Sequence, residues 1–204
     1  PEWDDCRLRI QKLNDEHNGT MYITQGFIAS STSPKTTTTL GREGSDFTAA
    51  IFANGLDAKE LTIWKDVDGL RNADPKRFPD TQKIEHLSYF EAIELAFYGA
   101  SIIHPNTLKP LQNKNIPLKV RSFLDTSLEP SVIDGTKEYI EYVPSFIVKE
   151  KQTLMSITPR DYSFMNEHNR ALIFNIMDEL NIHANMTQVS ALVLSICFDE
   201  NEKK

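Results

Sequence analysis

A glycine- and hydroxyl-rich stretch that leads directly into small apolar residues constrains this chain most. Residues 37–46 read Thr-Thr-Thr-Leu-Gly-Arg-Glu-Gly-Ser-Asp, and the apolar segment that follows predicts a helix over residues 47–56. Gly41 and Gly44 allow the backbone to approach a ligand closely. The helix would direct its free N–H groups and its positive dipole end at that ligand, and Arg42 can bind a carboxylate through two hydrogen bonds. The pattern predicts a small-anion site beside phosphates.

The same residues also fit an ordinary helix start. Ser45 or Asp46 can serve as the N-cap, and the threonine run can be the edge of a strand. The stretch matches neither the dinucleotide-binding fingerprint nor the P-loop. Taken alone, it leaves both interpretations open.

A second polar loop follows residues 61–64, which read as a short buried strand. Open α/β sheets bind ligands at the carboxyl ends of their strands. Lys65, Arg71 and Lys76 are placed to face a triphosphate there, and Asp66 to face a ribose or a metal ion. The alternative is a solvated turn rich in aspartate, glycine and proline.

The acidic residues of this second loop also suggest a calcium-binding loop, but their positions relative to the glycine and the twelfth residue exclude one. Counted from Asp66, the glycine falls too early. The twelfth position is Arg77 instead of the bidentate glutamate that such a loop requires.

These two loops, together with later motifs, resemble the aspartate kinases of the amino acid kinase family. The resemblance extends from about residue 22 to residue 133, and its motifs occur in the family's order. They are Thr-Thr-Leu-Gly-Arg-x-Gly-Ser-Asp, Ile-Trp-x-Asp-Val-x-Gly with a later Asp-Pro, Glu-Ala-x-Glu-Leu-Ala-x-x-Gly-Ala, Ile-His-Pro and Asn-Ile-Pro. The resemblance implies ATP- and Mg²⁺-dependent phosphorylation of the β-carboxylate of L-aspartate. It also implies regulation by an amino acid, lysine or threonine, at ACT domains.

The resemblance further implies roles for individual residues. Arg42 and Ser45 would hold L-aspartate, Glu43 and Gly44 would complete that loop, and Asp46 would orient the catalytic groups. The expected nucleotide contacts are Lys65, Asp66, Arg71, Lys76, Ser101 and Ile102. The two loops must then share one cleft.

Several positions depart from the common family pattern. Glu43 stands where glycine is usual, so it adds a negative charge beside the anion site. Lys65 replaces threonine, Arg71 replaces tyrosine and Lys76 replaces arginine. Ser101 stands where many members carry lysine, and one hypothesis is that Lys65 supplies the missing cation.

The Lys-Phe-Gly-Gly segment that opens aspartate kinases does not occur here. The expectation is therefore a piece of such an enzyme, without kinase activity of its own. Residues 1–138 would be the C-terminal half of the kinase domain, and residues 139–204 a partial ACT regulatory domain. Whether a homoserine dehydrogenase belongs to the parent protein is open.

The last part of the chain predicts a strand within residues 147–158, an amphipathic helix over residues 166–180 and a strand over residues 192–198. This order resembles the start of a ferredoxin-like ACT unit. The resemblance implies effector contacts at Ala184, Asn185, Gln188, Val189 and Ser190, and a homodimer formed through paired ACT units. An ordinary hairpin edge that binds nothing is the alternative.

Composition narrows the function classes. The 204 residues carry a formal net charge of −7, which disfavours nucleic acid and anionic membranes as partners. Two cysteines cannot form a disulfide framework and favour a cytoplasmic location. No membrane-spanning stretch is visible, and His86, His168 and His183 lack metal-ligand spacing.

Residues 21–29 read as a strand, and Ser88-Tyr-Phe-Glu91 is a capping box that opens a helix. Strand and helix segments alternate in this first part of the chain, which predicts an α/β fold with a mostly parallel sheet flanked by helices, a partial amino acid kinase fold. Two functional classes follow: a piece of aspartate kinase, or a non-catalytic module that binds an amino acid and dimerises. A third option is another amino acid kinase, such as one acting on glutamate. The Gly-Arg-x-Gly-Ser-Asp loop and the ACT-like tail argue against that option.

Overall fold

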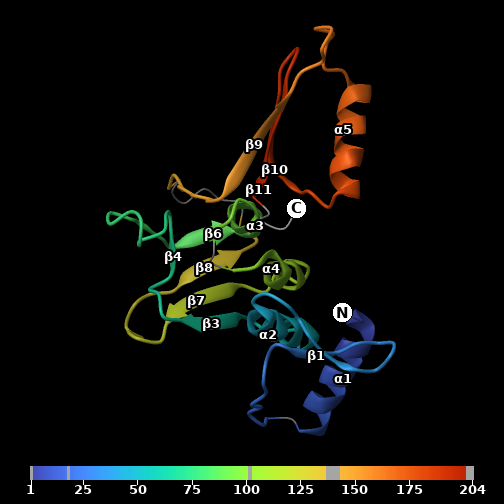
Figure 1. Ribbon diagram of the computed structural model, residues 1–204. Coiled ribbons are helices and arrows are strands. Elements are labelled where there is room, and N and C mark those ends of the chain that lie inside the picture. Colours follow the sequence, from blue (N-terminus) through green and yellow to red (C-terminus); the bar gives the residue numbers. More distant parts are fainter. Residues whose placement is uncertain (1, 18, 101–102, 137–142, 201–204) are drawn as a thin grey trace. The chain divides into compact units, whose positions relative to one another are not determined.

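The computed structural model describes residues 2–17, 19–100, 103–136 and 143–200. The chain forms two compact units, Pro1–Ile147 and Val148–Lys204, which are coloured from blue to red in Figure 1. The division falls after Ile147 because Phe146 belongs to the first unit, where its N–H donates to the carbonyl of Asn72 at 2.7 Å. The sequence placed the division after residue 138. Residues 137–142 lie outside the described part, so that boundary stays a prediction.

A four-stranded sheet forms the centre of the first unit. Its strands are β3 (Leu61–Lys65), β7 (Leu118–Ser122), β8 (Ser131–Asp134) and β6 (His86–Ser88), in the order β3-β7-β8-β6. β3 and β7 are parallel, β6 and β8 are parallel, and β7 and β8 are antiparallel. The mostly parallel α/β sheet expected from the sequence is confirmed, with one reversal in its middle.

Helices cover the buried face of this sheet. They are α2 (Gly44–Gly55), α3 (Tyr89–Phe97) and α4 (Pro105–Gln112). One hydrophobic cluster joins Ala50 and Ala53 of α2 and Leu108 of α4 to Leu118 and Val120 of β7. Because α2 contributes alanines, its backbone can lie close to the strands. On the opposite face, Trp64 remains about half exposed and the guanidinium of Arg121 lies over its ring.

Local signals fix the ends of two helices. At α3, Ser88 Oγ accepts from the N–H of Glu91 at 3.2 Å, and the Glu91 carboxylate accepts from the N–H of Ser88 at 2.9 Å. This reciprocal pair is the capping box that the sequence predicts. At α4, Pro105 is the first residue and the His104 ring accepts from the N–H of Asn106 at 3.1 Å.

The N-terminal helix α1 (Trp3–Glu16) packs on α2 through one buried residue, Ile10. Gly55 makes this contact possible, because a Cβ atom there would lie 2.8 Å from Ile10 Cδ1. The strands β1 (Ile28–Ser30) and β2 (Thr37–Thr39) then form a short hairpin.

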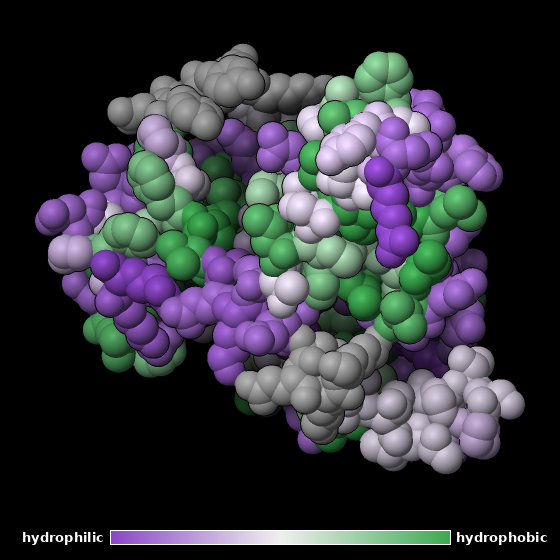
Figure 2. All heavy atoms as spheres, turned by 45° about the horizontal axis from the view of Figure 1, so that its top comes forward, coloured by the Kyte–Doolittle hydropathy of each residue, from purple (hydrophilic) through white to green (hydrophobic). Residues whose placement is uncertain are grey.

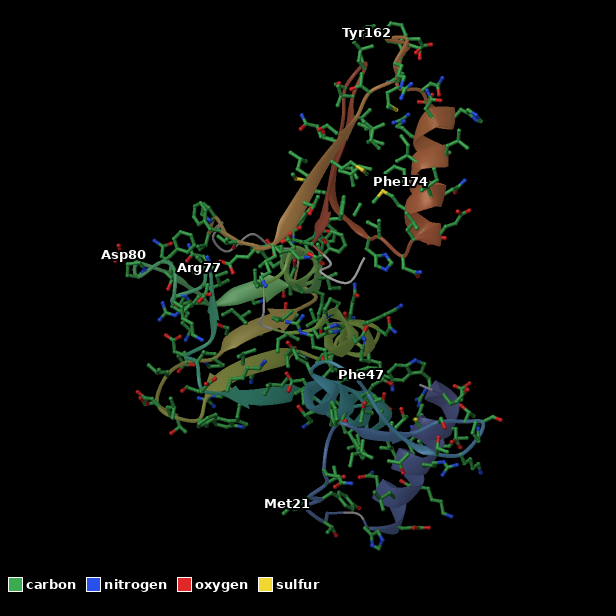
Figure 3. The ribbon with its side chains drawn as sticks, in the orientation of Figure 1. Met21, Phe47, Arg77, Asp80, Tyr162 and Phe174 are labelled. Atoms are coloured by element: carbon green, nitrogen blue, oxygen red, sulfur yellow. The ribbon has the colours of Figure 1, made fainter. Side chains whose placement is uncertain are left out.

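The strand expected over residues 21–29 is reduced to β1, so most of that prediction is wrong. Met21 and Ile23 are 87% and 94% exposed. Figure 3 shows Met21 on this segment, away from the four-stranded sheet. The segment has a strand-like sequence. No strand among the described residues pairs with residues 21–27, however, and β structure requires such a partner.

A two-stranded ribbon, β4 (Leu70–Arg71) and β5 (Lys83–Ile84), is attached at the start of the inner strand β8. The buried hydroxyl of Ser131 makes the attachment. It accepts from the N–H of Leu70 at 2.8 Å and donates to the carbonyl of Ile84 at 2.6 Å. A Cβ atom at Gly69, whose φ is +137°, would collide with this hydroxyl.

The second unit is an antiparallel sheet with one helix. Its elements are β9 (Gln152–Ile157), α5 (Glu167–Glu179), β10 (Ala184–Val189) and β11 (Leu194–Asp199), and the strand order is β10-β11-β9. Met165 and Met177 pack against Leu194 and Ile196 to form its core. This arrangement confirms the α+β character expected of the last part of the chain.

No helix among the described residues is long and apolar enough to cross a membrane. The face drawn in Figure 2 mixes hydrophilic and hydrophobic side chains. Cys6 and Cys197 are both free.

Candidate functional site

The loop before α2 is held in a tight conformation. Gly41 and Glu43 have φ angles of +79° and +52°, and the N–H of Gly44 donates to the carbonyl of Gly41 at 3.1 Å. Gly44 is buried, and a Cβ atom there would lie 2.8 Å from Phe27 Cδ2. Gly26 approaches Ser45 equally closely, because a Cβ atom added at Gly26 would lie 2.8 Å from Ser45 Cα. The sequence interpretation missed Gly26, because the contact with Ser45 depends on residues 19 positions apart in the chain.

The polar groups of this first loop face solvent. Arg42 and Ser45 are exposed, and neither side chain has a hydrogen bond or ion pair with another described residue. No described side chain caps α2. Of the N–H groups in its first turn, those of Gly44 and Phe47 already donate to the carbonyls of Gly41 and Glu43. Those of Ser45 and Asp46 have no acceptor among the described residues and are available to an anion.

An ion pair joins the first loop to the second. Asp46, the third residue of α2, places Oδ2 3.3 Å from Nζ of Lys65, the last residue of β3. The two side chains are only 17% and 24% exposed. The carbonyl of Lys65 accepts from the N–H of Phe123 at 3.0 Å, which fixes the end of β3 against the chain that leaves β7. The structure thus brings Asp46 and Lys65 together, as a shared cleft requires.

The other candidates on the second loop differ from one another. Asp66 and Lys76 are exposed. The Arg71 guanidinium binds both carboxylate oxygens of Asp68, at 3.0 and 2.6 Å, and both oxygens of Thr81 at 2.9 Å. These bonds use four of its five N–H donors. The hydrogen bonds from Arg71 lower the pKa of Asp68 below its usual range.

A third segment reaches the first loop through Glu43. Its Oε2 atom accepts from the N–H of His104 at 2.8 Å. His104 has a structural role, because its ring caps α4. Ser101 and Ile102 lie just before it in the chain, outside the described residues.

The effector candidates lie on β10 and the turn after it. Asn185 belongs to a polar cluster on the sheet of the second unit: its Nδ2 donates to Asp199 Oδ1 at 2.9 Å and to Gln152 Oε1 at 2.6 Å, and its Oδ1 accepts from Lys149 Nζ at 2.8 Å. Hydrogen bonds from Gln152 and then Lys149 lower the pKa of Asp199 to about 2. The sequence interpretation did not find these three partners of Asn185, since they come from β9, from β11 and from the residues before β9.

The remaining effector candidates make fewer side-chain hydrogen bonds than Asn185 does. Gln188 and Val189 are exposed at the edge of the sheet. Ser190 closes the turn to β11, where its N–H donates to the carbonyl of Val193 at 2.8 Å. Ala184 is partly buried and pairs with Phe198 of β11.

Comparison with known proteins places the chain in a family. A family model described as "Amino acid kinase family" matches residues 5–122. The chain belongs to the amino acid kinase family. Among curated members, lysine-sensitive aspartokinase 3 of Escherichia coli K12 is 33% identical over 95% of this chain and 43% of that protein. The chloroplastic bifunctional aspartokinase/homoserine dehydrogenase 2 of Zea mays is 30% identical over 100% of this chain and 23% of that protein.

Solved structures of aspartokinases are also similar to this chain. E. coli aspartokinase III in complex with aspartate and ADP superimposes with a TM-score of 0.80 at 29% identity, over 100% of this chain and 46% of that chain. The same enzyme in complex with lysine and aspartate superimposes with a TM-score of 0.76 at 30% identity, over 98% of this chain and 44% of that chain. This chain therefore spans less than half the length of these relatives.

Proposed function

We propose that this chain carries the amino-acid loop and part of the nucleotide site of an aspartate kinase. The enzyme would transfer the γ-phosphoryl group of ATP to the β-carboxylate of L-aspartate, giving 4-phospho-L-aspartate. The observation that carries the proposal is the ion pair between Asp46 and Lys65, because it joins the two loops that bear the candidate residues. The relative solved with aspartate and ADP supports the choice of both ligands.

The first loop suits an amino acid with two carboxylates. The Arg42 guanidinium can bind one carboxylate through two hydrogen bonds. The hydroxyl of Ser45 and the backbone N–H groups of Ser45 and Asp46 can donate to the same ligand. Asp46 would act as a catalytic organiser by fixing the ammonium of Lys65 beside the reacting groups, with no covalent intermediate.

The second loop would supply charge for the nucleotide. In the reaction, a carboxylate oxygen of aspartate attacks the γ-phosphorus while the bond to the β–γ bridging oxygen breaks, and that oxygen leaves on ADP. Such a transfer depends mainly on positioning and charge neutralisation. We assign the ammonium of Lys65 to the phosphates and place Asp66, Lys76, Ser101 and Ile102 along the nucleotide. Arg71 has one N–H donor left, so it can contribute a single contact.

Mg²⁺ would accompany the nucleotide. The described residues contain no group of three or more His, Cys, Asp or Glu that could hold a metal ion. This suits Mg²⁺ in a kinase, which commonly binds through substrate phosphates, water and one or two carboxylates. The exposed Asp66 is the described carboxylate that we assign to it.

Calorimetry of the 204-residue chain tests the proposal. L-Aspartate and Mg²⁺–ATP, titrated separately, should each bind. Arg42→Ala should weaken L-aspartate at least about tenfold, as expected for losing a charged bidentate contact, and should leave ATP unchanged. Arg9→Ala is the control, because Arg9 is an exposed arginine on α1 that pairs with Asp5. Absence of binding by both ligands, or unchanged aspartate affinity in Arg42→Ala, would contradict the proposal.

The second unit favours an additional role as an amino-acid sensor. Asn185 contacts both members of the Lys149–Asp199 ion pair, and the ammonium and carboxylate of a free amino acid can exchange with the members of that pair. We propose that an effector, lysine or threonine, contacts Ala184, Asn185, Gln188, Val189 and Ser190, and that this ACT-like unit supports a homodimer. The relative solved with lysine supports this choice.

The sensor role has its own test. Lysine and threonine should be titrated into the wild-type chain and Asn185→Ala, with the mass followed by light scattering. The sensor role would be contradicted if neither lysine nor threonine bound. It would also be contradicted if the chain stayed a monomer at all concentrations. The cytoplasmic location stays a prediction, because the relatives include both chloroplastic and bacterial enzymes.

A further inference from the structure

Glu43 occupies a backbone conformation that its side chain does not favour. Its φ and ψ angles of 52° and 33° lie in the left-handed region. Glycine adopts this region readily, whereas L-residues other than asparagine and aspartate seldom do. A glutamate at this position therefore calls for a compensating interaction.

The structure provides that interaction at the start of α4. Glu43 Oε2 accepts from the N–H of His104 at 2.8 Å, in a partly buried setting. His104 is the residue before α4, and its own ring accepts from the N–H of Asn106. The Glu43 carboxylate thus lies at the N-terminal end of an eight-residue helix, where the helix dipole favours a negative charge.

This bond links parts of the site that are far apart in sequence. Glu43 lies between Arg42 and Gly44 in the candidate amino-acid loop, while His104 follows the segment that contains Ser101 and Ile102. On its other side, the loop is held by the contact of buried Gly44 with Phe27. Packing therefore restrains one side of the loop, and the Glu43 carboxylate restrains the other.

We propose that Glu43 is a positioning residue, whose carboxylate ties the amino-acid loop to the start of α4 and thereby holds Arg42 and Ser45 in a binding conformation. Because the carboxylate accepts the His104 N–H, its negative charge is partly compensated. It therefore repels an anionic ligand less than an unbound carboxylate would. The inference rests on the proposed function for the identity of that ligand. The restraint on the loop does not depend on the ligand.

Amide hydrogen exchange of the 204-residue chain tests the restraint directly. The informative amides are those of His104, Gly44 and Phe47, which all have backbone or Glu43 acceptors. Glu43→Ala and Glu43→Gly should raise their exchange rates at least about tenfold by allowing local opening. Glu43→Gln keeps an acceptor oxygen and should restore protection. The amide of Tyr98, at the end of α3, should stay unchanged.

Binding measurements on the same variants test the consequence. Glu43→Ala should weaken L-aspartate about tenfold, the equivalent of one hydrogen bond to a charged group. It should leave Mg²⁺–ATP unchanged, and Glu43→Gln should recover most of the aspartate affinity. Glu94→Ala, which removes an exposed carboxylate from α3, is the matched control.

The outcomes separate the two proposals. Unchanged loop amides in Glu43→Ala would overturn the positioning role, and so would exchange in Glu43→Gln as fast as in Glu43→Ala. Unchanged aspartate affinity in a variant with a loosened loop would also overturn it. If the wild-type chain does not bind L-aspartate, the proposed function fails, and the loop amides alone decide the role of Glu43.

Discussion

The Nζ atom of Lys65 lies 3.3 Å from Oδ2 of Asp46, and both side chains are largely buried. The pair joins the last residue of β3 to the first turn of α2. Double-mutant analysis should measure their coupling. Lys65→Met should destabilise the first unit by about 1–3 kcal/mol, since it leaves a partly buried carboxylate without this cation. Asp46→Asn should lower the free energy of unfolding by less than Lys65→Met does. The double variant should lower it by less than the sum of the two single substitutions.

Urea denaturation gives these free energies of unfolding. The pair Arg9→Ala and Asp5→Ala, an exposed ion pair on α1, should show a coupling of no more than about 0.5 kcal/mol. A coupling for Asp46 and Lys65 as small as that of the exposed pair would contradict the structural role given to them.

Ser131 joins the β4–β5 ribbon to the sheet through two buried hydrogen bonds. Ser131→Ala should destabilise the chain by about 2–3 kcal/mol, because it leaves the N–H of Leu70 and the carbonyl of Ile84 unpaired. Thermal or urea denaturation measures the loss. Ser127→Ala, at an exposed serine, should change stability by less than about 0.5 kcal/mol. Equal effects of the two substitutions would show that the hydroxyl of Ser131 does not hold the ribbon.

Gly69 tolerates no side chain, whereas Gly19 has room for one. Both have positive φ angles, of +137° and +80°, but only at Gly69 would an added Cβ meet Ser131. Gly19→Ala should therefore cost about 1 kcal/mol from its backbone conformation. Gly69→Ala should cost about 3 kcal/mol or more, since a steric clash adds to strain. Comparable losses at the two glycines would contradict the close approach at Ser131.

Asp199 should titrate at an unusually low pH. Hydrogen bonds from Gln152 and Lys149 lower its pKa from 3.8 to about 2. Because the folded-state pKa is lowered, the stabilising contribution is complete above the unfolded-state value and is lost as the pH falls through about 2. Carboxylate chemical shifts followed by NMR should show this midpoint.

Gln152→Ala should raise that midpoint toward 3.8, the unperturbed value. Gln188→Ala is the control, because Gln188 is an exposed glutamine of the same unit and has no hydrogen bond to Asp199 among the described residues. A midpoint near 3.8 in the wild-type chain would show that the cluster does not form in solution.

Local chemistry explains which parts of the fold were predictable. The capping box of Ser88 and Glu91 lies within four residues, so the start of α3 follows from the sequence alone. Asn166 likewise caps α5 through the N–H of Asn169, and Asn181 follows that helix with a φ of +52°. The strand expected over residues 21–29 failed for the opposite reason, because strand formation depends on a partner that a local pattern cannot supply.

The candidate site shows the same contrast. The motif around Arg42 marked the first loop, yet the bond from Glu43 to His104 spans 61 residues. The sequence also gave no sign that Asp68 and Thr81 already occupy most donors of Arg71. The partners of Asn185 come from β9, from β11 and from the residues before β9, so only the folded sheet brings them together.

The reversal between β7 and β8 has a consequence for how this architecture can vary. β3 ends and β6 begins at the same margin of the sheet, so the chain between Asp66 and Glu85 returns without traversing either face. Its exposed part, residues 74–80, can grow, shrink or be exchanged without rethreading the strands, while Leu70 and Ile84 stay in the core. The framework therefore permits new ligand preferences to evolve at that margin while the helices behind it keep their packing.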